Sequence, residues 1–344
     1  MTSTTQRIYI FDNAKALLIL LVVLGHAADY YTSQYESLRT FFIFTYLFHM
    51  PLFIFLAGLF SKSTINKDPF RSERVLHFFT LYFVLEVAFY VLRHFVLGEE
   101  KFRFNPFVED GVPWFMFAMG VWLILGRLLR DTAPLIVLTL SVIGMLFIGY
   151  FPIGDQLVAS RIIAFFPFFI AGYYTDPKQL AQLLQATSLK IISWMLLALA
   201  AVTIWANIER VYNVRLMLSG RNPYDAVKMQ LDLPAGDIVL KLLVTMITIC
   251  LSIAILAISS KNHSWFTKIG ERSLAIYFFH RFFLYLYHGL YINEWLQQIF
   301  PNRWLAIYLT FFVLVTLFLA LAPFHSVLQW FEKQTARLFT SRNK

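Results

Sequence analysis

Asp12, Lys15 and His26 interrupt an otherwise apolar stretch near the N-terminus of the chain. In a helix, Lys15 and His26 would lie about 20° apart around the axis and roughly 16 Å apart along it. Asp12 falls on the same stripe. Because polar groups are costly in a bilayer, such a stripe is expected to face a cavity lined by protein. His26 is the candidate general base, since a neutral imidazole can accept a proton near neutral pH.

The same residues also permit plainer roles. An intramembrane histidine such as His26 can serve packing alone, through a hydrogen bond between helices. Asp12 and Lys15 are three positions apart, so they could simply neutralise each other. The shared stripe favours a functional role, and it makes Asp12, Lys15 and His26 the candidate catalytic group.

Further polar residues stand in other apolar segments of the chain. His49 precedes Pro51, which is expected to kink its helix, and the kink could be structural or could shape a cavity. Glu86 needs a partner, for which the lysine of the first segment or a histidine is the candidate. Tyr277 and His280 are three positions apart and could line one cavity. His49, Glu86, Tyr277 and His280 are therefore candidate substrate-binding residues.

Basic residues stand at the predicted cytoplasmic start of the third apolar segment. Arg71 and Arg74 lie at its entry, with His77 one turn further on. Anchoring to the inner leaflet is the default explanation for arginines at such a position. A sharper interpretation is a bidentate contact to a phosphate that arrives from the cytoplasm. Arg71, Arg74 and His77 are accordingly candidate cofactor-binding residues.

The elements that must position these residues are membrane helices. Hydrophobic residues make up 59% of the chain and charged residues 14%, against about 25% charged in an average soluble domain. A spanning helix needs about 20 mostly apolar residues. The sequence therefore predicts an all-α polytopic bundle of about ten spans, at roughly 8–30, 40–60, 75–97, 113–130, 134–152, 157–175, 188–207, 236–258, 273–293 and 304–323. The first is expected to be an uncleaved span.

Basic residues predict the orientation and the domain organisation. They are more numerous in the loops that share a side with the N-terminus, which predicts that both termini are cytoplasmic. Anionic lipid, rather than nucleic acid, explains the net charge of +9. Residues 1–323 are expected to form the transmembrane domain, and residues 324–344 a basic cytoplasmic tail that lies as an interfacial helix on the inner leaflet. No oligomeric state is predicted.

Two predicted outer segments are long enough to recognise a ligand. One is 98–112, which leads into Trp114, and the other is 208–235. Aromatic residues beside carboxylates suit contact with a sugar, although they also suit ordinary interfacial loops. Trp114 thus joins the candidate substrate-binding residues. The histidine spacing matches no local metal-binding motif, so no metal is predicted.

Five motifs, in this order, carry a resemblance to a known family. They are Asp12-Asn13-x-Lys15 through Gly25-His26, Phe48-His49-Met50-Pro51-Leu52-Phe53, Trp114-Phe115, Phe166-Pro167-Phe168-Phe169-Ile170-Ala171-Gly172-Tyr173, and Ser273-Leu274-x-Ile276-Tyr277-x-x-His280. Their order and spacing resemble the integral-membrane acyltransferase family 3, most closely its fucose 4-O-acetylase-like branch. The resemblance covers nearly the whole chain.

This resemblance implies a membrane O-acyltransferase of the bacterial inner membrane. Such a protein would move an acetyl group from cytoplasmic acetyl-CoA to a hydroxyl of a cell-envelope glycan or lipid-linked sugar. His26 would act as general base or acyl carrier, and Lys15 would join Arg71 and Arg74 in binding the CoA phosphates. Lys15 stands where most members have arginine, and Phe79 stands where a second arginine is usual, so the CoA clamp departs from the family pattern.

Two rival functions use the same residues differently. A proton-coupled transporter or flippase would use the intramembrane aspartate, lysine, glutamate and histidine side chains as a proton relay. The sequence has no evident inverted repeat, which weighs against this rival. A structural membrane subunit would leave the buried charges unexplained.

Overall fold

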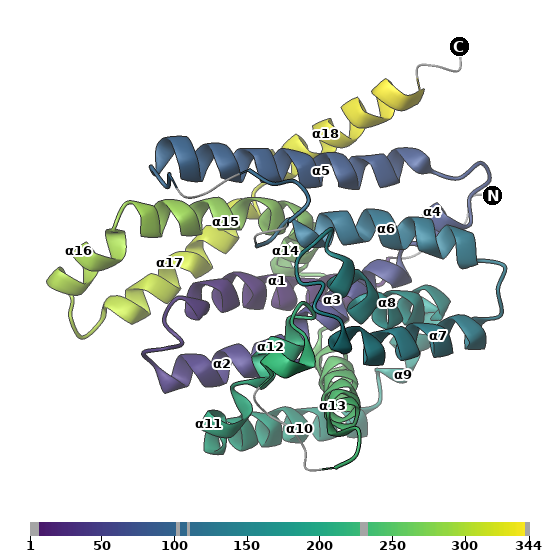
Figure 1. Cartoon of the computed structure of the whole chain (residues 1–344), viewed down its shortest axis with the longest axis horizontal. Coiled ribbons are helices and arrows are strands. Elements are labelled where there is room, and N and C mark those ends of the chain that lie inside the picture. The colour runs from purple at the N-terminus through teal and green to yellow at the C-terminus, as the bar shows by residue number, and fades with distance from the viewer. Residues whose placement is uncertain (1–6, 101–103, 109–110, 228–232, 341–344) are drawn as a thin grey trace.

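The chain forms a bundle of helices in a computed structural model that describes residues 7–100, 104–108, 111–227 and 233–340 (Figure 1). Within these residues the only β pairing is an isolated bridge between Val108 and Gln156. The all-α class predicted from composition and hydropathy is confirmed, and the molecule is an apolar helical bundle of the membrane type.

Every predicted apolar segment contains at least one helix with closely similar bounds. These helices are α1 (Tyr9–Asp29), α2 (Glu36–Tyr46), α3 (His49–Leu59), α5 (Ser72–Tyr90), α6 (Trp114–Leu129), α7 (Pro134–Phe147), α8 (Ala159–Tyr174), α10 (Thr187–Ala206), α13 (Gly236–Ile258), α15 (Ser273–Gly289) and α17 (Trp304–Leu319). Shorter helices were not predicted; they are α4 (Lys62–Ile65), α9 (Pro177–Leu183), α11 (Ile208–Val211), α12 (Val214–Leu218), α14 (Trp265–Glu271) and α16 (Ile292–Ile299).

Fewer helices reach full membrane length than the ten predicted spans. In the described residues, five are long and apolar enough to cross a bilayer: α1, α2 with α3, α5 with its π-helical end Val91–Val96, α10 and α13. The bent pair α17 and α18 (Ala322–Thr340) would make a sixth. The apolar helices α6, α7 and α8 are shorter, so the number of spans stays a prediction.

The predicted kink at Pro51 takes the form of a break in the second segment. Helix α2 ends at Tyr46, and α3 begins again at His49. Pro51 lies in the first turn of α3. If one helix continued from α2 into α3, the Pro51 ring would clash with the carbonyl of Leu47, four residues earlier. The chain therefore interrupts the helix at residues 47–48, which places His49 at the start of a new helix.

Helices α3 and α8 are held unusually close by two glycines. A Cβ atom at Gly58 would lie 1.9 Å from the carbonyl oxygen of Phe169, and one at Gly172 would lie 2.0 Å from that of Phe55. Small residues allow membrane helices to approach backbone to backbone, where packing supplies most of the attraction. This contact fixes the helix that carries His49 against α8.

Helix α1 runs through the middle of the bundle and packs against α2, α3, α14, α15 and α17 (Figure 1). Its first turn is tied to the segment before α14. The Asn13 side chain donates to the carbonyls of Ser260 and Asn262 at 2.7 and 2.9 Å, and the Thr267 hydroxyl donates to Asn13 Oδ1 at 2.7 Å. These bonds hold the helix that carries Lys15 and His26 in a defined position.

The C-terminal segment that was expected to form a basic tail is helical. Helix α18 follows α17 after a bend of 55° and packs against α5 and α15. Leu328 and Thr335 are buried there. The tail therefore has a protein-facing side in addition to any contact with lipid. Residues 341–344 of the predicted tail lie outside the described residues.

Candidate active site

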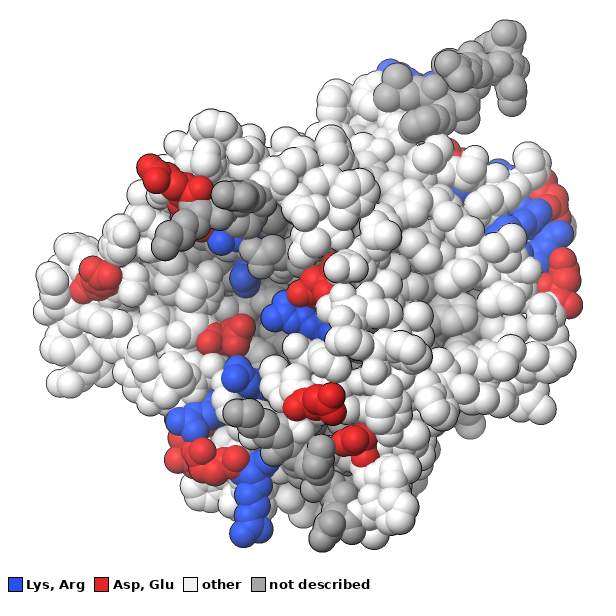
Figure 2. All heavy atoms as spheres, in the orientation of Figure 1, with Lys and Arg blue, Asp and Glu red and all other residues white. Residues whose placement is uncertain are grey.

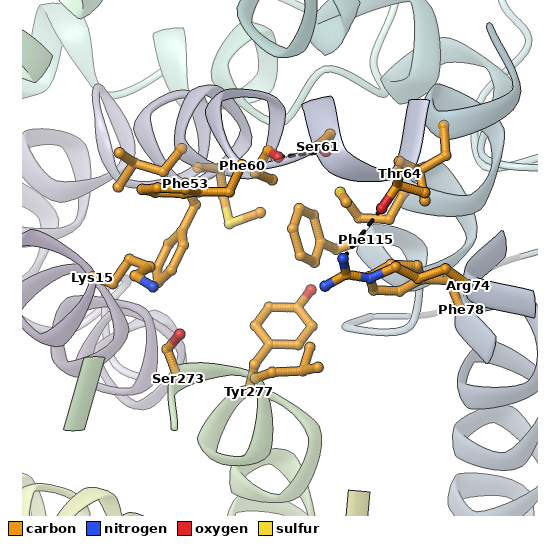
Figure 3. A pocket seen from close by; sticks show the side chains of 16 residues that line it. Lys15, Phe53, Phe60, Ser61, Thr64, Arg74, Phe78, Phe115, Ser273 and Tyr277 are labelled. Carbon is orange, nitrogen blue, oxygen red and sulfur yellow. Dashed lines mark hydrogen bonds between the residues drawn. The ribbon is translucent and has the colours of Figure 1, made fainter. Parts of the chain in front are cut away.

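A cavity of about 240 Å³ lies between α1, α3, α4, α6 and the starts of α5 and α15 (Figure 3). Its charged lining residues are Lys15 and Arg74, and most of the others are apolar or aromatic. We call it the Lys15 cavity. Its lining consists of Lys15, Met50, Phe53, Leu56, Ala57, Phe60, Ser61, Thr64, Arg74, Phe78, Phe115, Met119, Leu123, Ser273, Leu274 and Tyr277.

The charge of Lys15 is compensated within the chain. Its Nζ lies 2.7 Å from Asp12 Oδ1 and 5.7 Å from the centre of the Phe60 ring. Asp12 also accepts a hydrogen bond of 2.7 Å from Arg7 Nε. Asp12 is buried and does not line the cavity. The neutralising role considered for Asp12 is therefore the one that its geometry supports, and this aspartate fixes Lys15 at the cavity wall.

Arg74 enters the same cavity from the opposite wall. Its Nη1 donates to Thr64 Oγ1 at 3.2 Å, and Figure 3 shows its guanidinium directed toward the Tyr277 hydroxyl. The other two predicted cofactor-binding residues of this helix do not line the cavity. Arg71 pairs with Glu73 at 3.2 Å, and His77 is buried in α5.

A second cavity, of about 320 Å³, lies at the opposite end of α1. It is formed by the last turn of α1, the end of α2, the starts of α3, α6 and α8, helix α12 and the middle of α15. We call it the His26 cavity. Its lining consists of His26, Asp29, Phe42, Tyr46, His49, Met50, Gly111, Trp114, Arg161, Phe165, Arg215, Leu216, Leu218, Ser219, Arg221, Asn222, Tyr277 and Arg281.

Three histidines gather at this second cavity. His26 is partly exposed and lines it, and its ring stacks on that of His280 with centroids 5.4 Å apart. His280 is completely buried behind it and does not line the cavity. His49 is the third histidine. The Tyr46 ring contacts both His26 and His49, with centroid distances of 6.5 and 4.5 Å. Of His26 and its stacked neighbour, only His26 is open to the cavity.

Backbone carbonyls determine the neutral tautomer of two of these histidines. Nδ1 of His280 lies 2.8 Å from the Tyr277 carbonyl oxygen, and Nδ1 of His49 lies 2.9 Å from that of Thr45. A carbonyl oxygen only accepts, so each Nδ1 must carry the hydrogen and each Nε2 keeps its lone pair. His26 has no hydrogen bond to another described residue. Its ring is therefore available to a ligand.

Four arginines at the His26 cavity were not among the predicted site residues. They are Arg161, Arg215, Arg221 and Arg281. Figure 2 shows charged side chains around a hollow near the centre of a face that is otherwise largely uncharged. The clearest sequence signal was Arg281, a charge that directly follows His280 within an apolar segment. The others could not be assigned to one site before the loops were placed in space.

The two predicted outer segments meet at this cavity. The first contributes Gly111 and leads into Trp114, whose ring packs on the Arg161 guanidinium at 5.0 Å. The second contributes α12 and the residues that follow it, including Arg215. Parts of both segments, 101–103, 109–110 and 228–232, lie outside the described residues.

Met50 and Tyr277 line both cavities and so stand between them. The Tyr277 hydroxyl donates to the carbonyl of Val112 at 2.6 Å, which joins α15 to the segment before α6. Glu86 is buried in α5 and lines neither cavity. Of the predicted substrate residues, His49, Trp114 and Tyr277 thus reach the His26 cavity directly, and His280 reaches it only through His26.

The described residues contain no group of three or more histidine, cysteine, aspartate or glutamate side chains placed to hold a metal ion. The two cavities differ from each other in the chemistry that their side chains offer. One presents cations above an apolar wall, and the other presents histidine bases among arginines. This combination suits a phosphate-bearing donor at one end and a hydroxyl-bearing acceptor at the other.

Comparison with known proteins agrees with the motif pattern. Residues 8–322 match the Acyl_transf_3 family model, described as an acyltransferase domain. The nodulation protein NolL of Mesorhizobium japonicum is 26% identical over 182 residues, which is 49% of this chain and 48% of that protein. NolL of Sinorhizobium fredii is 40% identical over 63 residues, 17% of each chain. The matches thus span at most about half the length of these curated relatives. No solved structure matches.

Proposed function

We propose that this chain, which belongs to the acyltransferase 3 family, transfers an acetyl group from acetyl-CoA to a hydroxyl of a cell-envelope glycan or lipid-linked sugar. The observation that carries the proposal is the pair of cavities at opposite ends of α1, which share Met50 and Tyr277. A donor and an acceptor that approach from opposite faces of a membrane would need such an arrangement.

The Lys15 cavity is proposed to receive the donor. Lys15 and Arg74 would bind its phosphates, because both cations face the cavity and Arg74 offers a planar fork. The aromatic walls, with Phe53 and Phe115 among them, would pack along the pantetheine arm and exclude water. Bound acetyl-CoA would supply the acetyl group as a reactive thioester.

His26 is proposed to act as the general base. It accepts the proton of the acceptor hydroxyl while that oxygen forms the ester bond and the carbon–sulfur bond breaks. It then returns the proton to the sulfur that leaves. His280 is a positioning residue, since its ring stacks on His26 from a fully buried site. A transient acetyl group on His26 itself is the other route open to this side chain.

The proposal is tested by mass spectrometry of envelope glycans from cells that carry the chain, the His26→Ala variant or neither. Acetyl groups should depend on the chain and disappear in the variant. Membranes supplied with labelled acetyl-CoA and no acceptor distinguish the two routes, because an acyl carrier would become labelled itself. Full glycan acetylation by His26→Ala at equal protein levels would refute the role of this histidine.

The same proposal sets the orientation of the chain in the inner membrane. Lys15 and Arg74 must open toward cytoplasmic acetyl-CoA, so the N-terminal end of α1 and both termini would be cytoplasmic. A C-terminal fusion to green fluorescent protein should fluoresce, and a fusion to alkaline phosphatase should be inactive. The reverse result would place the donor cavity on the wrong face.

A further inference from the structure

The His26 cavity holds more positive charge than its described neighbours compensate. Four arginines and one aspartate, Asp29, line it. Asp155 lies 3.4 Å from Arg161 and 3.3 Å from Arg221, so these two arginines have an anionic partner. Arg215 and Arg281 have none: neither forms an ion pair with a described residue, and neither does Asp29.

The surroundings of these two arginines leave hydrogen-bonding capacity open. Arg215 donates from Nη1 to the Tyr212 hydroxyl at 3.2 Å, and its guanidinium packs on that ring at 4.4 Å. Arg281 lies over the rings of Tyr285 and Tyr30 at 5.1 and 5.9 Å. The Nε of each arginine is buried without a hydrogen-bond partner. Aromatic faces hold both guanidinium groups in place without neutralising their charge.

A charge kept in this setting implies a ligand. Arg281 belongs to α15, an apolar helix. The charge of Asp29 acts on Arg281, Arg215 and Arg221 together, so positive charge remains in excess, which is costly there unless an anion reaches it. It directly follows His280, whose ring stacks on His26. An anion bound at Arg281 and Arg215 would therefore lie in the same cavity as the proposed base.

We infer that the acceptor carries an anionic oxygen group, a phosphate ester or a carboxylate, which Arg281 and Arg215 bind in the His26 cavity. The inference rests on the proposed function and narrows the acceptor to anionic sugars and sugar phosphates. The guanidinium fork matches both kinds of anion in a bidentate manner. Asp29, which faces the same cavity, is left to accept hydrogen bonds from neutral sugar hydroxyls.

The anion site can be tested without turnover, by measuring how small anionic probes bind to the full chain in phosphatidylcholine nanodiscs. CoA is kept saturating, so that the Lys15 cavity is occupied and phosphate sites there do not contribute. Isothermal titration calorimetry then uses inorganic pyrophosphate as the phosphate probe and glucuronate as the carboxylate probe. Binding of the first identifies a phosphate group on the acceptor, and binding of the second identifies a carboxylate.

Arg281→Gln and Arg215→Gln should each weaken binding of that probe at least tenfold, because each removes charge-assisted hydrogen bonds. Arg281→Lys keeps the charge but loses the fork, and it should recover part of the affinity. Arg303→Gln is the control: Arg303 directly precedes α17, is exposed and does not line the cavity, so its loss should leave affinity unchanged.

The inference is overturned if neither probe binds, or if both glutamine variants bind as the unmodified chain does. A variant that does not fold is identified by size-exclusion chromatography, and Arg281→Lys then carries the test. The proposed function fails separately. If labelled acetyl-CoA transfers no acetyl group while the arginine-dependent binding persists, the catalytic role is wrong and the anion site remains.

Discussion

The two ends of α1 differ in how their charges are compensated. At the first turn, Asp12 lies 2.7 Å from Lys15, so the chain supplies its own counter-ion. At the last turn, Arg281 and Arg215 border the cavity of His26 without any ion pair among described residues. At the first end, the lysine charge can therefore lie in an apolar wall without a ligand. At the second end several arginines share the charge of Asp29, so an excess of positive charge is left for an anion.

This difference indicates a division of work along one helix. The Lys15 cavity is mostly aromatic and aliphatic, which suits a long apolar arm held by a few cations at its mouth. The His26 cavity is rich in polar groups that suit recognition of a sugar. Variants at the first end should therefore change the dependence on acetyl-CoA, and variants at the second should change chemistry or acceptor binding.

The largest effect is expected at His26. Replacing it with alanine removes the proton acceptor, which contributes about 10²- to 10⁴-fold in comparable reactions. The turnover rate should fall by that factor, while the KM for acetyl-CoA stays within about twofold because the Lys15 cavity is untouched. Radiolabel transfer in membranes measures both values. A raised KM for acetyl-CoA with normal turnover would reverse the assignment of the two ends.

Arg74→Gln should act at the other end and be the next largest effect. It removes a cation that has no ion pair among the described residues and faces the cavity. A lost charge-assisted contact of about 1.5–3 kcal/mol corresponds to a roughly 10- to 100-fold higher KM for acetyl-CoA. Turnover at saturating donor should change little.

Arg71→Gln is the matched control for Arg74, since both arginines start the same helix and Arg71 pairs instead with Glu73. We expect less than a twofold change in KM from it. Equal effects of the two substitutions would mean that general positive charge at this membrane face, rather than the cavity itself, attracts the donor.

The fold was largely predictable because membrane helices can be recognised in a sequence by their length and hydropathy. All ten apolar segments contain helices, and the break before Pro51 has a local cause. Short helices such as α12 and α14 were not predicted, because their few residues show no strong apolar periodicity. Their positions depend on tertiary contacts, such as those of Asn13 with the backbone before α14.

Residues of the candidate site could be predicted together only where they lie on the same helix. The stripe on α1 singled out Lys15 and His26, and each of them lines one of the two cavities. Arg71 and Arg74 stand at the same end of one predicted segment, and the structure shows that only Arg74 lines the cavity. The position of Phe79 has a physical reason as well: its ring packs on Phe117 with centroids 5.2 Å apart, away from the cavity.

Lys15 should matter less than Arg74, because Asp12 already compensates its charge. Lys15→Gln is expected to raise the KM for acetyl-CoA about three- to tenfold, the lower part of the range for a charged contact. Lys15→Arg restores the charge and adds a planar fork, so its KM should equal or fall below that of the unmodified chain. Steady-state transfer at varied acetyl-CoA measures both.

Asp12→Asn provides the second half of this test. Arg7 and Lys15 lose their shared anion, and the uncompensated Lys15 should then bind donor phosphate with its full charge. Lys15→Gln should consequently cost more in the Asp12→Asn background than alone, a non-additivity read from a double-mutant cycle. Strictly additive effects would show that Asp12 does not tune Lys15.

The smallest effect concerns the short helix α4, which carries Thr64, the partner of Arg74. Arg127 donates to the carbonyl of Ile65 at 3.0 Å, and Arg127 and Arg130 both bond to Asp68. The hydrogen bond from Arg127 has the largest effect on the pKa of the Asp68 carboxyl and that from Arg130 the next largest, and both lower it. With a lowered folded pKa, its stabilisation is present above the ordinary carboxyl value of about 4 and is lost as the pH falls through the lowered one.

Asp68→Asn should therefore lower the melting temperature slightly at pH 7 and flatten its decline below about pH 4. Asp68 is fully exposed, so the change should stay small. Because only α4 and the residues after it are loosened, the KM for acetyl-CoA should rise by about twofold or less, with probe affinity at Arg281 unchanged. Thermal unfolding in nanodiscs across pH, together with both binding assays, measures this. An equal loss at both cavities would mean that the two ends of α1 are mechanically coupled rather than independent.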